Sequence, residues 1–115
     1  MNQMPEKIEK SIKEFINGVN KLFGNRAKRV ILYGSYARGD YRENSDIDIM
    51  ILIDLSDKEI NEYGERIWDF AYDIQLENDV LISPLIKNID KFNNWLDFLP
   101  FYMNVQKEGV VLSES

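Results

Sequence analysis

The sequence predicts an α/β (α+β) fold in which helices pack on a small mixed β-sheet. Two patterns carry this prediction. Long segments with apolar residues at helical spacing alternate along the chain with short β-branched runs, and the run at 46–54 alternates strictly between two faces. The chain has 115 residues, 44% hydrophobic and 30% charged, which is the balance of a globular chain and the length of one domain. We therefore expect one domain over residues 1–115.

Four helices are predicted from apolar spacing and from the residues at the helix ends. They cover residues 5–23, 56–75, 88–96 and 100–107. In the first helix, Pro5 suits the first turn and Gly24 follows the last. The second helix begins with the capping-box pair Ser56 and Glu59. Large aromatic residues at helical positions are expected in the core or in an interface, and they are Trp68, Phe70, Phe92 and Trp95.

Short apolar runs predict the strands, which cover residues 29–33, 46–54, 79–86 and a tail at 110–112. Along the second strand, successive side chains face opposite sides. One side is made by Ile47, Ile49, Ile51 and Ile53, and the other by Asp46, Asp48, Met50 and Leu52. Because the second side is acidic only at its start, the pattern indicates a central strand that is buried along most of its length and wet at one end.

The composition excludes several kinds of chemistry. The chain has no Cys and no His, which excludes disulfides, thiol catalysis and Ser-His-Asp mechanisms and leaves carboxylates, hydroxyls, Arg, Lys and metal ions. No apolar run approaches the roughly 20 residues of a membrane span, and Met1 is followed by a polar stretch instead of a signal peptide. We expect a cytoplasmic protein with no membrane contact.

Charge is distributed unevenly along the chain. Residues 1–45 hold nine basic and five acidic side chains, whereas residues 46–115 hold five basic and fifteen acidic ones. The acidic second half argues against direct binding to long nucleic acid, because that affinity comes mainly from neutralising many phosphates. It is compatible with a small anionic ligand near the basic half and with a basic protein partner against the acidic half.

The segment at 34–48 carries the chemistry. Gly34 and Ser35 follow a strand and open a short helix, so that backbone N–H groups, a hydroxyl and a helix dipole converge where a phosphate can bind. Asp46 and Asp48 lie two apart on a strand, so their carboxylates project from one face as oxygen ligands suited to Mg²⁺. A cation beside a phosphate-binding turn indicates metal-assisted phosphoryl or nucleotidyl transfer.

This segment resembles the signature of the DNA polymerase beta-like nucleotidyltransferase superfamily: Gly34-Ser35, ten intervening residues, then Asp46-x-Asp48. The chain is similar to the minimal nucleotidyltransferases (MNT) of that superfamily, which include the MntA-type antitoxins of HEPN/MNT toxin-antitoxin pairs. Residues 34–39, 45–48 and the tail at 100–109 look typical of this branch. The resemblance spans nearly the whole chain and implies a polymerase beta-like fold.

The resemblance also implies roles for the site residues. Ser35 and the backbone of Gly34 would hold the β- and γ-phosphates of a nucleoside triphosphate, and Asp46 and Asp48 would hold two Mg²⁺ ions. A third carboxylate on a neighbouring strand helps to activate the acceptor hydroxyl in such enzymes, and Asp79 is the residue that fits, as catalytic group and metal ligand. An Asp before a strand is also commonly a turn residue.

Cations near the turn can contact the triphosphate. Arg38 is the best placed, because its planar donors can stabilise charge that develops on pyrophosphate. Arg38 could instead pair only with Asp40 or Glu43.

The function implied is transfer of AMP from ATP to a hydroxyl, often of tyrosine, on a helical HEPN ribonuclease toxin, with the chain acting as antitoxin. Two alternatives stay open: a non-catalytic antitoxin that neutralises its partner by binding, and transfer to a small molecule such as an aminoglycoside. A chain of this length is expected to work with a docking partner, as a homo-oligomer or a hetero-oligomer.

Overall fold

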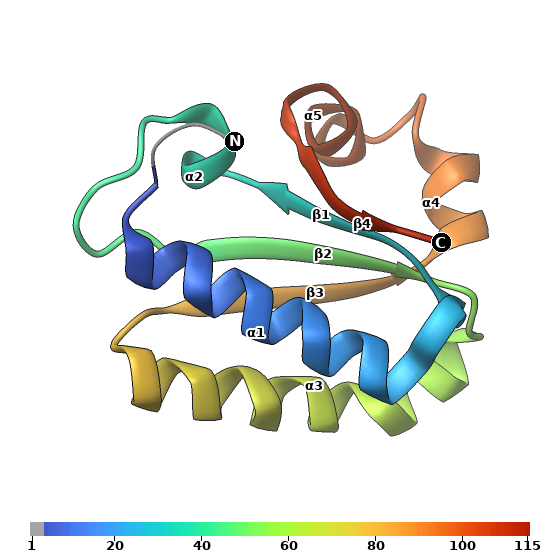
Figure 1. Cartoon of the computed structure of the whole chain (residues 1–115). Helices are drawn as coiled ribbons and strands as arrows, with labels where there is room; N and C mark the ends of the chain where they lie inside the picture. Colours follow the sequence, from blue (N-terminus) through green and yellow to red (C-terminus); the bar gives the residue numbers. More distant parts are fainter. Residues whose placement is uncertain (1–3) are drawn as a thin grey trace.

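The computed structural model describes residues 4–115, so Met1 and the first two residues of the polar N-terminal stretch lie outside the described residues. The elements, in chain order, are α1 (Glu6–Phe23), the 3-10 turn η1 (Gly24–Arg26), β1 (Ala27–Tyr33), α2 (Ser35–Arg38), β2 (Ile47–Ile53), α3 (Asp57–Asn78), β3 (Ile82–Asn88), α4 (Ile89–Trp95), α5 (Pro100–Glu108) and β4 (Val110–Glu114) (Figure 1). Within residues 4–115, no helix has the length and apolar character needed to cross a membrane.

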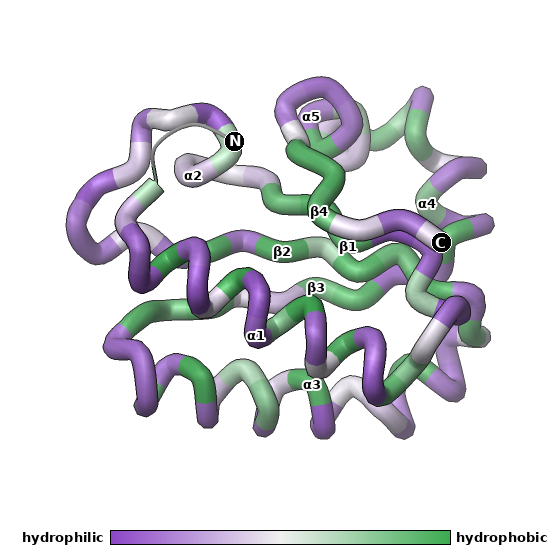
Figure 2. Tube along the Cα trace, in the orientation of Figure 1, coloured by the Kyte–Doolittle hydropathy of each residue, from purple (hydrophilic) through white to green (hydrophobic). Residues whose placement is uncertain are grey.

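The four strands form one mixed sheet in the order β3-β2-β1-β4. β1 pairs antiparallel with both β2 and β4, whereas β2 and β3 are parallel and joined by α3 (Figure 1). β1, β2 and β3 are largely hydrophobic, while the loop between α2 and β2 is hydrophilic (Figure 2). The predicted α/β fold with a small mixed sheet is confirmed, and β2 is a central strand as its sequence indicates.

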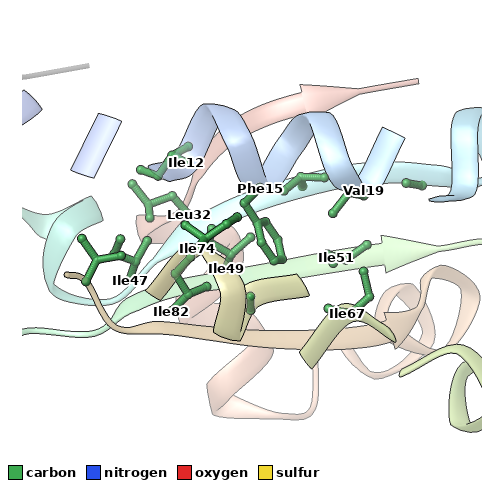
Figure 3. Close-up of a cluster of buried hydrophobic side chains, with 14 of the residues drawn as sticks. Ile12, Phe15, Val19, Leu32, Ile47, Ile49, Ile51, Ile67, Ile74 and Ile82 are labelled. Carbon is green, nitrogen blue, oxygen red and sulfur yellow. The ribbon is translucent and has the colours of Figure 1, made fainter. Parts of the chain in front are cut away.

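The main core lies between the sheet and the helices α1 and α3. Side chains at helical spacing on α1, including Phe15 and Val19, meet Ile49 and Ile51 of β2 and Ile74 of α3 (Figure 3). All of these side chains are buried. The capping box predicted at the start of α3 is present, with the Ser56 side chain accepting a hydrogen bond from the Glu59 backbone N–H.

The opposite face of the sheet carries a smaller core under α4 and α5. Its buried members are Ile31, Met50, Leu52, Phe92 and Val105. The alternation of β2 therefore divides its side chains between two cores, with the isoleucines in the large one and Met50 and Leu52 in the small one.

One detail of the fold differs from the prediction. The third strand begins at Ile82 and not at Asp79, because α3 continues to Asn78 and Asp79 follows it in a left-handed conformation, with φ 55° and ψ 54°. Of the two environments expected for the large aromatic residues, core or interface, Trp68 and Trp95 do not occupy the core, because they are 54% and 53% exposed in the chain described here. Since each helix buries only one stripe, Ile67 and Phe92 occupy the buried positions beside them.

Candidate nucleotide-transfer site

A pocket of about 620 Å³ opens where β1 ends and β2 begins, on the face of the sheet that carries the smaller core. It is lined by Tyr33, Gly34, Ser35, Arg38, Ser45, Asp46, Asp48, Phe101, Asn104, Val105 and Glu108. Five of the six site residues predicted from the sequence are thus brought together: Gly34, Ser35, Arg38, Asp46 and Asp48. α5 packs beside β1 and forms the other wall.

The turn after β1 lies directly against the carboxylate of Asp48. Gly34 has φ 74°, a conformation that side chains rarely adopt, and a Cβ atom at this position would overlap the carboxylate of Asp48. Tyr33 and Asp48 are directly paired across the two strands, which fixes this approach. The glycine therefore allows the glycine-serine turn and the acidic strand to meet within one pocket.

The two aspartates concentrate negative charge at the start of β2. Partial burial, followed by the charge of Asp46, raises the pKa of Asp48 above its ordinary value, while the nearby Arg38 lowers it by a smaller amount. The loop before Asp46 is held by a turn in which the Arg42 backbone N–H donates to Ser45 Oγ at 2.7 Å. The unfavourable electrostatics of this pair favour a cation as the ligand between them.

Arg38 lies at the rim of the pocket between two acidic groups. Its Nε donates to Asp40 Oδ2 at 3.2 Å, and its Nη1 lies 3.5 Å from Glu108 Oε2 on α5. The hydrogen bond to Asp40, and then the contact with Glu108, raise the pKa of Arg38, so it stays charged. The pairing with Asp40 was one of the two weighed from the sequence, and the structure adds Glu108 in place of Glu43.

Tyr33 is a pocket residue that the sequence reasoning missed. Burial, and secondarily the charge of Asp48, raise the pKa of Tyr33 to about 12. Its ring packs edge-on against Phe101, with centroids 5.6 Å apart at 77°. The alternation of β1 could have revealed it, since Tyr33 shares a face with Ile31 and lies opposite Asp48.

One face of α5 supplies four further pocket residues that were missed, and Ser45, just before Asp46, is another. The four on α5 are Phe101, Asn104, Val105 and Glu108. Their spacing of three, four and seven residues is that of a single helical stripe. The mixture of polar and apolar residues on this stripe was the available signal, because Val105 packs into the smaller core while Asn104 and Glu108 face the pocket.

The structure does not bring Asp79 to this pocket. Asp79 lines a neighbouring hollow beside Lys7, which shares Ser45 with the pocket, and its side chain is exposed. On the neighbouring strand β3, Ser83 is the residue in register with Asp48. The position where a third carboxylate would stand beside Asp48 is therefore a serine, and the third carboxylate that lines the pocket is Glu108 on α5.

The donor set fits a magnesium ion that is also held by substrate. Within residues 4–115, no group of three or more Asp, Glu, His or Cys side chains could hold a metal ion by itself. Mg²⁺ commonly binds through one or two carboxylates together with substrate phosphates and water. Asp46 and Asp48, on one face of β2 beside the glycine-serine turn, match that requirement.

Comparison with known proteins identifies the family to which the chain belongs. Residues 12–111 match the family described as nucleotidyltransferase domain. A protein of Methanocaldococcus jannaschii, provisionally named protein adenylyltransferase MJ0604, is 38% identical over 104 residues, which cover 90% of this chain and 96% of that protein. A second protein of that organism, provisionally named protein adenylyltransferase MJ0141, is 44% identical over 65% of this chain and 74% of its own length.

Solved structures share the fold. A crystal structure of a toxin-antitoxin with AMP-PNP superposes with a TM-score of 0.54 at 20% identity, covering 88% of this chain and 72% of that chain. A mutant of the toxin-antitoxin MntA-HpeT gives a TM-score of 0.53 at 20% identity over 98% of this chain and 75% of that one. With the match over residues 12–111 and the relative that is similar along almost its entire length, this chain belongs to the nucleotidyltransferase domain family.

Proposed function

We propose that this chain transfers AMP from ATP to a hydroxyl group of a partner protein, and that it acts as the antitoxin of a HEPN-type ribonuclease toxin. The observation that carries the nucleotidyl transfer is the close approach of Gly34 to the carboxylate of Asp48, which puts the phosphate-binding turn against the acidic strand. Arg38 and Asp46 line the same pocket, so cationic and anionic groups for a metal-bound triphosphate lie together.

In the proposed reaction the acceptor hydroxyl oxygen attacks the α-phosphorus of ATP. The bond from that phosphorus to the oxygen bridging to the β-phosphate breaks, pyrophosphate leaves, and the hydroxyl proton passes to a carboxylate or to water. Ser35 and the backbone at Gly34 hold the terminal phosphates. The Arg38 guanidinium stabilises the charge that develops on pyrophosphate.

Asp46 and Asp48 are the residues that would hold Mg²⁺. When bound, the metal would neutralise charge on the phosphates and orient them. Before it binds, burial of Asp48 and then the charge of Asp46 raise the pKa of Asp48, so the ionised pair is destabilised. The two carboxylates therefore bind a nucleoside triphosphate together with its cation better than the nucleotide alone.

Two observations support a protein as the acceptor. The relatives in M. jannaschii are named for adenylyl transfer to protein, and the structures that share the fold are toxin-antitoxin proteins. The described part of the chain is 34 × 28 × 21 Å across, and its pocket is open. A partner that docks onto this domain would supply the acceptor group itself.

A second candidate function is neutralisation of the partner by binding alone. The observation that favours it is Ser83, which stands in register with Asp48 where a third carboxylate would assist the acceptor hydroxyl. In this case the pocket would bind a nucleotide without transferring it.

One experiment separates the two functions. The chain is incubated with ATP, Mg²⁺ and the protein encoded by the adjacent gene, and both chains are weighed intact by mass spectrometry. A gain of one or more AMP units on the partner, lost in Asp46→Asn/Asp48→Asn, supports transfer. A stable complex with an unmodified partner supports binding alone. If the partner is neither modified nor bound, the antitoxin proposal is contradicted.

A further inference from the structure

An apolar strip runs along the outer side of α3, away from the nucleotide pocket. Its members are Trp68, Tyr72 and Leu76, which are 54%, 56% and 66% exposed. They are spaced four residues apart and therefore line up along one side of the helix. Large apolar side chains that are contiguous and exposed mark interaction surfaces, whereas scattered ones do not.

The strip points away from the core because the other side of α3 is fully used. Ile67, Ala71 and Ile74 are buried and belong to the large core. The helix is held at its start by a capping box and packs on β3 and α1 (Figure 1). The strip therefore lies on a well-ordered helix face, and nothing in the described part of the chain requires it to be apolar.

Acidic side chains border the strip on the same helix. They are Glu62, Glu65, Asp69, Asp73 and Glu77, all exposed. Among the residues that the structure describes, none of the five takes part in an ion pair. Arg66 is the one basic residue between Glu62 and Glu77, so the face combines apolar contact area with net negative charge.

We propose that this face of α3 docks a partner protein through an apolar surface bordered by Lys and Arg residues. The negative charge of this face indicates which class of partner it binds. A second copy of this chain, placed with α3 against α3, would bring two acidic faces together, whereas a basic rim would pair with them and speed association.

The proposed docking face and the nucleotide pocket lie on opposite sides of the sheet. α3 covers the face of the sheet that carries the large core, while the pocket opens on the face of Asp48 and α5. A partner seated on α3 leaves the pocket free. The inference does not depend on the proposed nucleotidyl transfer.

The two tryptophans allow a direct test on the full chain. In Trp95→Phe the remaining tryptophan is Trp68, on the proposed face, and in Trp68→Phe it is Trp95, on α4. Each variant is titrated with a helical peptide that carries a leucine stripe flanked by lysines, and with a twin in which glutamates replace the lysines. We expect a saturable blue shift for Trp68 with the lysine peptide only, and no shift for Trp95.

Charge reversal gives the second measurement. Asp69→Lys/Asp73→Lys in the Trp95→Phe background should weaken binding of the lysine peptide by about tenfold, the effect of roughly 0.7 kcal/mol for each lost pair. Asp90→Lys/Asp97→Lys, on and beside α4, is the matched control and should change it little. Equal responses from both tryptophans, equal binding of the two peptides, or no binding would overturn the proposal. Dimerisation of the unmodified chain that Leu76→Ser abolishes would also overturn it, because a second copy would then occupy the face.

Discussion

The two sides of β2 show how one strand serves stability and chemistry separately. On one side, isoleucines at alternate positions lie in the large core under α1 and α3. On the other, Met50 and Leu52 lie in the smaller core, while Asp46 and Asp48 line the pocket. The difference arises because α1 and α3 cover the strand from end to end, whereas α4 and α5 leave its first residues open. Substitutions on the two sides should therefore have different consequences, although the residues are neighbours in sequence.

The largest effect is expected from Asp46→Asn/Asp48→Asn. Loss of both carboxylates should lower AMP transfer by about 10²- to 10³-fold or more, since charge neutralisation at the reacting phosphate is lost. The stability of the folded chain should not decrease. The pKa of Asp48 is raised in the folded chain, so its ionised form opposes folding at neutral pH, and Asp48→Asn alone should raise the melting temperature. Transfer is measured by intact mass and stability by calorimetry. Asp54→Asn, just beyond the other end of β2, is the control, and an equal loss of transfer there would contradict the assignment.

On the core side, Ile51→Ala should lower the free energy of unfolding by about 2–5 kcal/mol, because Ile51 is fully buried and its truncation leaves a cavity. The rate of transfer by the folded fraction should be unchanged, since the side chain points away from the pocket. Urea unfolding and transfer rates at a temperature where the variant is folded test both statements. A loss of rate like that of the aspartate variants would show that the two sides are coupled.

Arg38→Lys tests the rim of the pocket. Lys keeps the charge but lacks the planar donors, so kcat/KM for ATP should fall by about tenfold or more, the value of a hydrogen bond to a charged group. Arg42→Lys, in the adjacent loop and outside the pocket, should have little effect. If the two variants behave alike, Arg38 acts only through its charge or not at all.

Asp79→Asn contrasts the sequence expectation with the structure. Removal of a carboxylate that activates the acceptor would lower the rate of transfer by about a hundredfold. Asp79, however, is exposed and lines a different hollow. We expect transfer to stay within about twofold of the unmodified chain, as for a surface substitution away from the site. A large loss in steady-state transfer would return Asp79 to the reaction.

The smallest effect concerns the cap of α3. Hydrogen bonds from the Ser56 backbone N–H and hydroxyl lower the pKa of Glu59 below its ordinary value of 4.5. A carboxyl group whose pKa is lower in the folded chain than in the unfolded chain stabilises the fold at pH values above its unfolded pKa. This stabilisation is lost as the pH falls through the pKa of the folded chain. Unfolding free energies measured by urea from pH 6 downward should therefore fall below about pH 4.5 more steeply in the unmodified chain than in Glu59→Gln. Glu62→Gln, outside the cap, should keep the steeper fall, and identical curves for all three proteins would show that the cap is not coupled to pH.

Local sequence was enough to predict much of the site. Gly34, Ser35, Asp46 and Asp48 come from one segment of fifteen residues, and the strands at its two ends pair with each other. Their meeting depends on a short loop and on the period of a strand, both of which are readable from the sequence. The start of α3 at Ser56 was also readable, because its capping box is made by residues three apart in the sequence, and α1 begins one residue after Pro5.

The remaining pocket residues could not be placed in this way. Glu108 and Asn104 reach the pocket from α5, about sixty residues after Asp46 in the sequence, and only the packing of Val105 on the sheet sets which side of α5 faces it. Asp79 was misplaced for a similar reason. Whether it starts a strand or ends a helix depends on how far α3 extends along β3, which is fixed by the packing of Ile74 and Val80 in the core.

The sequence by itself determined the class of fold, the alternation of β2 and the pairing of a glycine-serine turn with two aspartates, because each depends on interactions between residues close in the chain. Only the tertiary structure decided that Glu108 and not Asp79 lines the pocket, that Ser83 stands in register with Asp48, and that the outer side of α3 is left uncovered. These depend on which helix covers which part of the sheet. Burial of apolar surface sets that arrangement, and it acts between residues that are distant along the chain.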